Sequence, residues 1–256
     1  MKSFIAFVKK DLVGSLRIGK IYIIAGIFLL FGIMNPVIAK LTPFIMDLFA
    51  ESLEETGMTL VQVEVNALTS WAQYYKNISM LLIAFVCICS DAFTGEYGKG
   101  TLILILTKGI SRYKIVLSKT IVMILMWSVG YLLYYVSTYL GTAIFWDNST
   151  VPNIEFAAFC WWVLGILTIS FVTLSSVIMK NYIGVLLGTG GAFLVLYIIS
   201  LIPKIGLYIP SSLMNSGTLI AGVESAEDYI KTIVIAFVTT ATCIVASIPI
   251  FNKKQL

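Results

Sequence analysis

The residues that could carry chemistry are few, and their spacing argues against a motor in this chain. The fragment nearest to a phosphate-binding loop is Gly98-Lys99-Gly100-Thr101. That loop needs GxxxxGK followed by Ser or Thr. Phe93 stands where the first glycine should be, and Gly100 follows the lysine. The sequence therefore predicts no ATPase here, so energy for any uphill movement must come from another chain.

Metal chemistry and acid–base catalysis are also unsupported. The chain has no histidine, which is the commonest metal ligand and general base. Its four cysteines lie inside apolar runs, where a thiol is usually a small buried hydrophobe. The apolar cores contain no Asp, Glu, Lys or Arg, whereas ion-coupled transporters and intramembrane enzymes keep such groups at mid-membrane. We expect no metal site, no cofactor in this chain and no enzymatic activity.

The elements that must position any functional residue are membrane spans. Of the 256 residues, 59% are hydrophobic and 12% are charged, against about 25% charged in ordinary soluble domains. The apolar residues come in runs near bilayer length, which predicts an all-α integral membrane protein with a single domain over residues 1–256. Six transmembrane helices are expected at about 21–39, 77–93, 120–145, 156–179, 183–202 and 232–251.

The distribution of charge predicts the orientation. Six spans place both termini on one side, and most of the 17 cations fall on that side. Because Lys and Arg resist translocation, we expect both termini in the cytoplasm of a multi-pass protein. The expected location is a bacterial inner (plasma) membrane.

Two segments flank this scheme. Met1–Gly19 reads as a basic amphipathic helix lying in the inner membrane interface, and a frayed cytosolic tail is the alternative. Leu201–Val223 is apolar but is broken by Pro203 and Pro210. It fits two re-entrant half-helices before the last span, or else an outer loop lying on the surface.

The loop Asp91–Lys119 between the second and third spans holds the densest positive charge. Its middle, Leu102–Leu106, is too short to span a bilayer and too apolar for a free linker. A short apolar helix flanked by cations lies at the membrane face or docks into the groove of a partner. We interpret it as the contact through which a cytosolic subunit acts on the membrane part.

Small and hydroxyl-bearing residues mark two later spans. Gly184, Gly188 and Gly191 have small-residue spacing that lets helices approach closely, either within the chain or between two copies. A run of hydroxyls in the fourth span either lines a polar path or bonds back to the helix backbone. The candidates for that path are Thr168, Thr173 and Ser176.

The basic loop resembles the membrane subunit of ABC-2 type transporters. The resemblance rests on Glu96, then Gly100-Thr101, then the turn Leu106–Arg112, then Lys119 opening the next span. The six-span layout, the N-terminal interfacial (elbow) helix and the broken segment before the last span are similar as well. Gly109 departs from the family, since many members have proline there.

The resemblance implies roles for the loop. Leu102–Thr107 would be a cytoplasmic coupling helix seated in an ATP-binding subunit. Glu96 would be a polar hinge, with helix capping as the alternative. Arg112 and Lys119 would meet the ATPase or lipid phosphates, with topology anchoring as the alternative. The full predicted contact set is Glu96, Thr101, Leu102, Leu104, Leu106, Thr107, Arg112 and Lys119.

The resemblance also implies partners and a function. ATP and Mg would bind in a separate ABC ATP-binding subunit, and a second copy or a homologous permease would complete the pair. Membrane lipids are expected around it, and no nucleic acid. The function expected is the permease subunit of an exporter for an amphipathic or apolar cargo such as a peptide, an antibiotic or a lipid-like molecule. The rivals are an ATP-coupled immunity or sensor subunit without bulk transport, and an ion-coupled secondary transporter.

Overall fold

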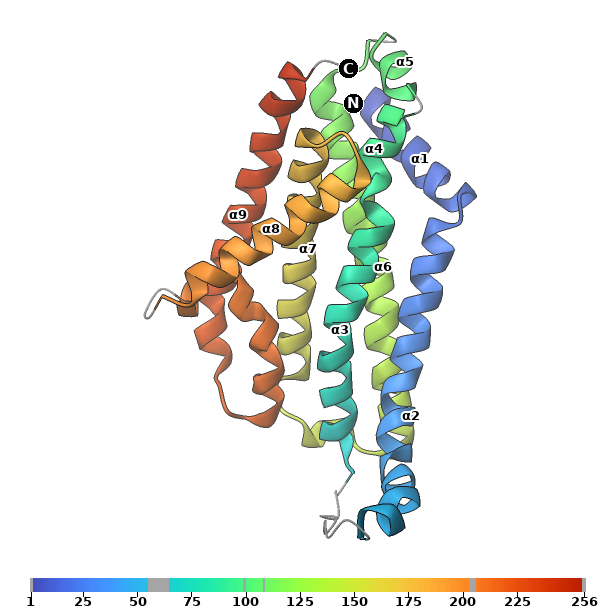
Figure 1. Cartoon of the computed structure of the whole chain (residues 1–256), viewed down its shortest axis with the longest axis vertical. Helices are drawn as coiled ribbons and strands as arrows, with labels where there is room; N and C mark the ends of the chain where they lie inside the picture. The colour runs from blue at the N-terminus through green and yellow to red at the C-terminus, as the bar shows by residue number, and fades with distance from the viewer. Residues whose placement is uncertain (1, 55–64, 99, 108, 203–205, 255–256) are drawn as a thin grey trace.

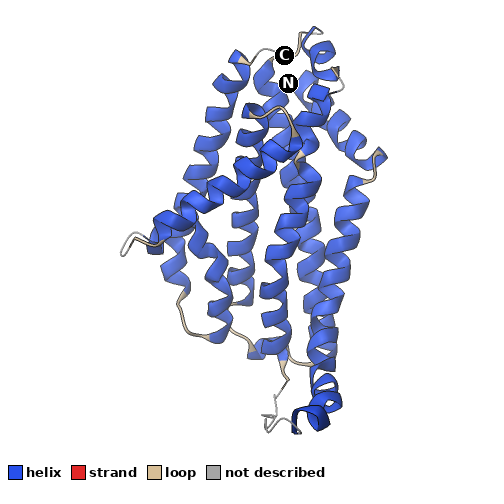
Figure 2. Cartoon of the chain, viewed as in Figure 1, coloured by secondary structure: helices blue, strands red, loops and turns tan. Residues whose placement is uncertain are grey.

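Helices make up nearly all of the computed structural model, which describes residues 2–54, 65–98, 100–107, 109–202 and 206–254 (Figures 1 and 2). Six of them are long and apolar enough to cross a membrane, so the predicted all-α membrane fold with six spans is confirmed. Both termini lie at the same end of the bundle (Figure 1).

The bounds of the helices are as follows. The long ones are α2 (Lys20–Glu54), α3 (Ala67–Cys89), α6 (Arg112–Phe145), α7 (Ile154–Ile178), α8 (Tyr182–Ser200) and α9 (Ala226–Lys253). The short ones are α1 (Lys2–Arg17), α4 (Asp91–Gly98), α5 (Thr101–Thr107), η1 (Asn148–Thr150), η2 (Gly206–Tyr208) and η3 (Pro210–Ala221).

Several helices run beyond the apolar stretches that predicted them. Helix α3 begins at Ala67, where the Asn66 side chain caps it, and α6 begins at Arg112 instead of near residue 120. The apolar stretch marks the membrane core, whereas backbone hydrogen bonding continues into the polar flanks. The helical part of the basic loop therefore includes the first two turns of α6.

Proline inside a helix ordinarily kinks or ends it, yet α2 continues through Pro36. Proline lacks an N–H, so the carbonyl of Gly32 four residues earlier loses its helical partner. The hydroxyl of Thr138 on α6 donates to that carbonyl, with 3.0 Å between Oγ1 and O. Gly141 on α6 leaves room for the Pro36 ring, because a Cβ there would lie 2.6 Å from Pro36 Cγ. The neighbouring helix thus supplies both a donor and space, which is how membrane helices tolerate proline.

Helix α7 is the centre of the bundle. It packs against α3, α6, α8, α9 and η3, and most of its residues are buried on every side. A helix that is apolar all round belongs in such a position. The largest buried side chains on the neighbouring helices α3 and α6 are aromatic, among them Trp71, Tyr74, Trp127 and Tyr134.

The segment between α8 and α9 is helical and packed. Helix α8 crosses the bundle obliquely, and η3 continues from its far end toward the end away from the termini (Figure 1). Leu213 and Leu219 of η3 are fully buried, and η3 packs against α7 and α9. The described residues of this segment therefore do not form a loose surface loop. Two re-entrant half-helices were expected, and the described part has the short η2 and the single 12-residue η3.

The N-terminal segment is the helix α1, and it packs against α6 and α2. The frayed-tail alternative is therefore wrong for the described residues. The helix turns Phe7 inward, whereas Ile5 is 61% exposed. Its placement in the membrane interface remains a prediction.

Candidate functional site

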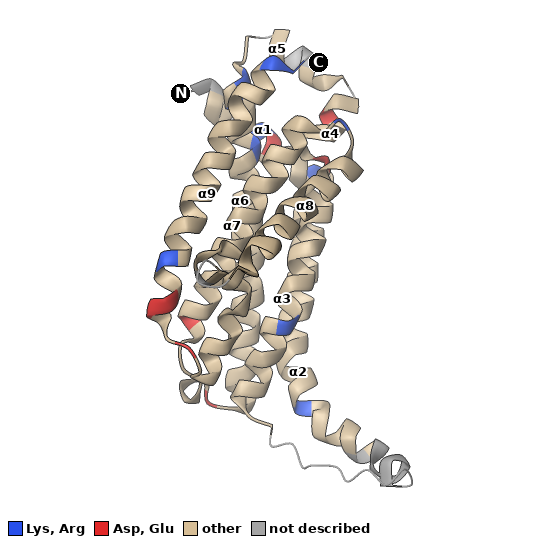
Figure 3. Cartoon of the chain, turned by 60° about the vertical axis from the view of Figure 1, so that its left-hand side comes forward, with Lys and Arg blue, Asp and Glu red and all other residues tan. Residues whose placement is uncertain are grey.

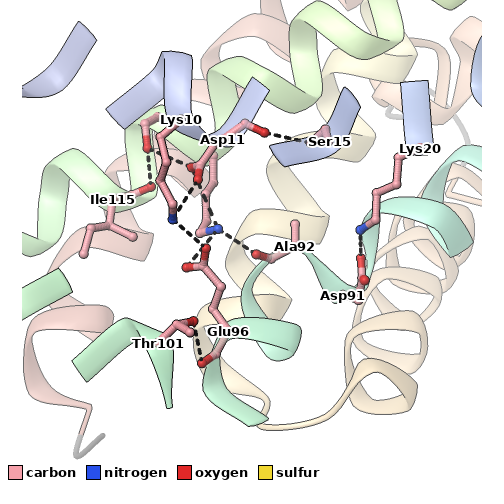
Figure 4. A network of polar contacts seen from close by, with 11 residues as sticks. Lys10, Asp11, Ser15, Lys20, Asp91, Ala92, Glu96, Thr101 and Ile115 are labelled. Atoms are coloured by element: carbon pink, nitrogen blue, oxygen red, sulfur yellow. Dashed lines mark hydrogen bonds and ion pairs between the residues drawn. The ribbon is translucent and has the colours of Figure 1, made fainter. Parts of the chain in front are cut away.

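A cluster of charged side chains joins three elements at the end that carries the termini. Lys10 and Asp11 come from α1, Glu96 from α4 and Lys119 from α6 (Figure 4). Lys119 Nζ lies 3.1 Å from Glu96 Oε2 and 3.8 Å from Asp11 Oδ2. Lys10 Nζ lies 3.1 Å from Glu96 Oε1 and 3.4 Å from Asp11 Oδ1. Two cations and two carboxylates thus form a closed network between segments far apart in the sequence.

Lys119 is the most buried member, with 6% of its side chain exposed. It lies two turns inside α6 because that helix begins at Arg112. Its ammonium donates to the backbone carbonyl of Ala92 at 2.8 Å and lies 5.5 Å from the centre of the Phe93 ring. A buried ammonium needs such partners, since burial without them costs several kcal/mol, roughly. The position of Lys119 favours a structural junction over a simple topology anchor.

Asp11 is the partner that the sequence analysis missed. Its side chain is 9% exposed, and burial raises its pKa, although Lys119 and Lys10 act to lower it. Burial acts to lower the pKa of Lys10, but the carboxylates of Glu96 and Asp11 outweigh it, so that pKa is raised. The signal in the sequence that could have identified Asp11 is a single acid in an otherwise basic helix, four residues after Phe7.

The cluster connects directly to α5, the predicted coupling helix. Thr101 Oγ1 at the start of α5 lies 3.5 Å from the backbone carbonyl of Glu96, to which it donates. Leu102 is buried, Leu106 packs partly against the core and Thr107 is exposed. Leu104 falls outside the residues whose side chains the structure describes. The structure therefore brings Glu96, Thr101 and Lys119 together at the base of α5.

Arg112 lies elsewhere at this end. Its Nη1 donates to the carbonyls of Phe251, Asn252 and Lys254, at 2.7, 3.0 and 2.8 Å, where α9 ends. The last carbonyls of a helix lack partners in a following turn, although that of Phe251 also accepts from the Lys254 backbone N–H at 3.3 Å. A guanidinium suits the negative end of the helix dipole. The start of α6 is thereby tied to the end of α9.

Lys254 makes the equivalent contact with α7. Its Nζ donates to the carbonyls of Val177 and Met179 at 2.7 and 2.8 Å and lies 4.2 Å from the centre of the Tyr97 ring. Burial, and then the nearby Lys180 ammonium, lowers the pKa of Lys254 to about 8. The ends of α4, α6, α7 and α9 are therefore connected through two cations.

The predicted packing and path residues lie apart from this site. A Cβ on Gly188 would approach Ser175 Oγ on α7 to 2.7 Å, whereas one on Gly191 would meet open space. A Cβ on Gly184 would meet its own turn at Asn181 Oδ1, 2.8 Å away. The hydroxyl-bearing residues of the predicted path are buried inside α7; they are Thr168, Thr173 and Ser176.

Two of these three hydroxyls donate hydrogen bonds to backbone carbonyls of their own helix. Thr168 and Thr173 donate to the carbonyls four residues earlier, at 2.8 and 2.9 Å. Ser176 Oγ is buried without a hydrogen-bond partner in the described part of the chain. Their role in a transport path remains a prediction.

A cavity of about 470 Å³ opens beside the charged cluster, between α1, α4 and α6. Lys20 and Asp91 form a further ion pair at its edge, and Val122 and Met126 form its apolar wall. Each charged group of the cluster already has an opposite charge beside it. The arrangement therefore suits a mechanical junction, in which ion pairs hold helices and re-form when those helices shift, and it offers no free base or nucleophile.

Comparison with known proteins agrees with this geometry. A family model described as ABC-2 family transporter protein matches residues 27–187, which covers α2 from its third turn through α7 and into α8. That range includes α4, α5 and the start of α6, and so two of the four charged residues of the cluster, Glu96 and Lys119. No curated protein matches the chain.

Proposed function

The chain belongs to the ABC-2 family of transporter proteins, and on that premise we propose that it is the permease subunit of an ATP-driven exporter. It is a multi-pass membrane protein and a membrane transport component. The proposal adds that ATP and Mg bind in a separate ABC subunit. It also adds that two permease chains, identical or homologous, pair in a bacterial plasma membrane with their termini in the cytoplasm.

The observation that carries the proposal is the attachment of α5 to the charged cluster. A seven-residue apolar helix projects at the end with the termini, beyond the bundle (Figure 1). Its first residue bonds to Glu96, whose carboxylate holds Lys119 of α6 and Lys10 of α1. A displacement of α5 would therefore be transmitted to α1, α4 and α6 together, as a coupling helix requires.

The charge distribution supports the proposed orientation. Figure 3 shows acids at the turns of the end away from the termini, while cations gather with the termini and α5. The positive-inside rule assigns the end with the termini to the cytoplasm. An ATP-binding subunit in the cytoplasm would then meet α5.

The experiment that tests the proposal is purification of the tagged chain from native membranes in mild detergent. A stoichiometric ATP-binding partner with vanadate-sensitive ATPase activity is expected. Its absence across several mild detergents, with the chain still monodisperse, would overturn the proposal. A partner and ATPase activity without any substrate flux in vesicles would assign the chain to an immunity or sensor complex.

The variant Leu104→Asp sharpens this test. It places a charge on a predicted contact residue of the coupling helix, so we expect loss of the partner while the chain still inserts. The matched control is Leu187→Asn, an exposed apolar position on α8 and outside α5. A complex of unchanged stoichiometry and ATPase activity in Leu104→Asp would contradict the coupling role.

A further inference from the structure

An aromatic groove runs along α6 and α7 toward the end away from the termini. It consists of two hollows of about 860 and 480 Å³, and both are lined by Tyr135 and Glu155. Because they share these residues, the two hollows adjoin, and together they are named the aromatic groove. It lies apart from the charged cluster, which is at the opposite end of these helices, and the proposed function does not use it.

The walls of the groove present ring faces and edges. Tyr135 and Tyr139 on α6 lie 6.1 Å apart, and Phe159 and Trp162 on α7 are stacked with centres 5.7 Å apart. Aromatic rings carry negative charge on their faces and therefore attract organic cations. Few other side chains bind an apolar surface and a positive charge together.

The rings are held in place by a hydrogen bond and by ring contacts with neighbouring side chains. Trp162 Nε1 donates to Ser128 Oγ at 3.1 Å, which fixes the indole. Trp71, fully buried behind α6, contacts Tyr135 and Tyr139 at 5.6 and 6.4 Å between ring centres. A groove whose walls are ordered beforehand loses less entropy when it binds a ligand.

Glu155 supplies a negative charge that is not neutralised within the described chain. It lies in the first turn of α7, is exposed, and forms no ion pair with any cation that the structure describes. Its carboxylate lies at the positive end of the α7 helix dipole. Tyrosines that merely anchor a helix at the membrane surface need no such carboxylate among them.

The protein already places an ammonium on aromatic rings of this groove. Lys40 Nζ of α2 lies 5.9 Å from the centre of the Phe145 ring and 5.8 Å from that of Trp146. Both rings line the larger hollow. The geometry of this wall therefore accepts a cation, and Glu155 lies further along the same groove with no cation beside it.

We propose that this groove is a binding site for an amphipathic organic cation, whose apolar body lies against Tyr135, Phe159 and Trp162 while its charge is held by Glu155. The side chains of the groove assign the class of ligand: apolar rings recognise its body, and the carboxylate with the ring faces recognises its charge. The site is open on the surface of a single chain, so neither a second copy nor an ATPase is needed for binding.

The test is equilibrium dialysis of the purified full chain in uncharged detergent against radiolabelled tetraphenylphosphonium. Tetraphenylborate, an anion of nearly the same size and shape, is the matched probe. We expect the cation to bind at least about tenfold more tightly than the anion, because one carboxylate and several ring faces oppose the anion. Equal binding of the two ions, or no binding of the cation, would overturn the proposal.

Matched variants locate the site. Glu155→Gln should weaken binding of the cation by about tenfold, while Glu227→Gln, which removes the same charge from the first turn of α9, should leave it within about twofold. Phe159→Leu should weaken binding by about fivefold, and Phe237→Leu, an equally exposed position on α9, should not. Equal losses for the members of either pair would overturn the assignment to this groove.

These outcomes are separate from those that test the proposed function. All four substituted side chains are exposed, so the core stays intact, and a monodisperse size-exclusion profile checks each variant. If a variant fails to fold, the comparison of tetraphenylphosphonium with tetraphenylborate on the unaltered chain still tests whether the protein prefers the cation. Failure to find an ATP-binding partner would leave cation binding intact, and loss of cation binding would leave the partner in place.

Discussion

At the scale of single residues, Lys119 decides how the end with the termini is built. Its ammonium is buried, and Asp11, Glu96 and the carbonyl of Ala92 surround it. Removing one partner of a buried ion pair leaves the other partner as an uncompensated buried charge, whereas an exposed ion pair contributes little to stability. The cluster therefore contains one critical cation and one dispensable cation.

Lys119→Met should lower the free energy of unfolding by about 3 kcal/mol, because Asp11 and Glu96 would then face each other with only Lys10 nearby. The control is Lys10→Met, whose side chain is 50% exposed and whose loss should cost less than about 1 kcal/mol. Thermal unfolding in detergent, followed by tryptophan fluorescence, measures both.

Combining Lys119→Met with Asp11→Asn should recover part of the loss, since the second change removes one of the two uncompensated carboxylates. A Lys119→Met chain as stable as Lys10→Met would contradict the importance of the buried pair.

Lys254 predicts a pH effect. Its pKa is lowered to about 8 in the folded chain by burial and by Lys180, so the folded chain releases this proton at lower pH than the unfolded chain. The contribution of Lys254 to stability therefore rises as pH increases from about 8 toward the usual lysine value near 10.4. Acylation of amines, followed by mass spectrometry, should show Lys254 reacting with a midpoint near pH 8 in native protein. The same midpoint in urea-unfolded chain would contradict the shift.

At the scale of elements, close approaches of glycine determine how the helices pack. Gly165 of α7 lies against the indole of Trp127, and a Cβ there would come within 2.0 Å of Trp127 Cε2. Trp127 is fully buried, so it has no space into which to move. By contrast, a Cβ on Gly190 of α8 would meet nothing within 4 Å.

Gly165→Ala should therefore lower the free energy of unfolding by about 1–3 kcal/mol through overpacking. Gly190→Ala should change it by less than about 1 kcal/mol, in the stabilising direction, because alanine favours helix over glycine. Unfolding midpoints of the two variants under identical conditions give the comparison. If both variants unfold at the midpoint of the unaltered chain, α7 and α6 are not packed as closely as described.

At the scale of the whole molecule, the six spans divide the polar residues between two ends. The end with the termini holds the ion cluster, α5 and the cations that tie the ends of α7 and α9. The other end holds the turn around Asp147 and the aromatic groove. Coupling and ligand binding would thus act at opposite ends of α6 and α7.

The proposed orientation predicts which end a membrane-impermeant thiol reagent reaches in intact cells. In a full chain with its four native cysteines replaced by alanine, Thr150→Cys should be labelled and Lys253→Cys should not. Both positions are exposed, so lysed cells should label both equally. Labelling of Lys253→Cys alone in intact cells would reverse the topology and remove the cytoplasmic contact proposed for α5.

The number and type of spans followed from the sequence alone, because the transfer of a continuous apolar run into lipid is a local property. The short apolar helix at Leu102–Leu106 was likewise visible, and the structure has α5 at Thr101–Thr107. The grouping of Glu96, Thr101 and Lys119 came from a resemblance to a family, and their distances needed the structure. Span boundaries were less accurate, since helical hydrogen bonding does not stop where hydrophobicity does.

What depended on contacts between distant segments could be decided only by the tertiary structure. Asp11 is an ordinary acid in the sequence, and it becomes part of a buried network because α1 packs on α6 beside Lys119. Pro36 signals a helix end by itself, and it is tolerated because Thr138, a hundred residues away, replaces the missing donor to Gly32. Glu155 on α7 lies in a hollow that is also lined by Tyr131 and Tyr135 of α6. In each case the free energy depends on partners that adjoin only after the bundle has packed.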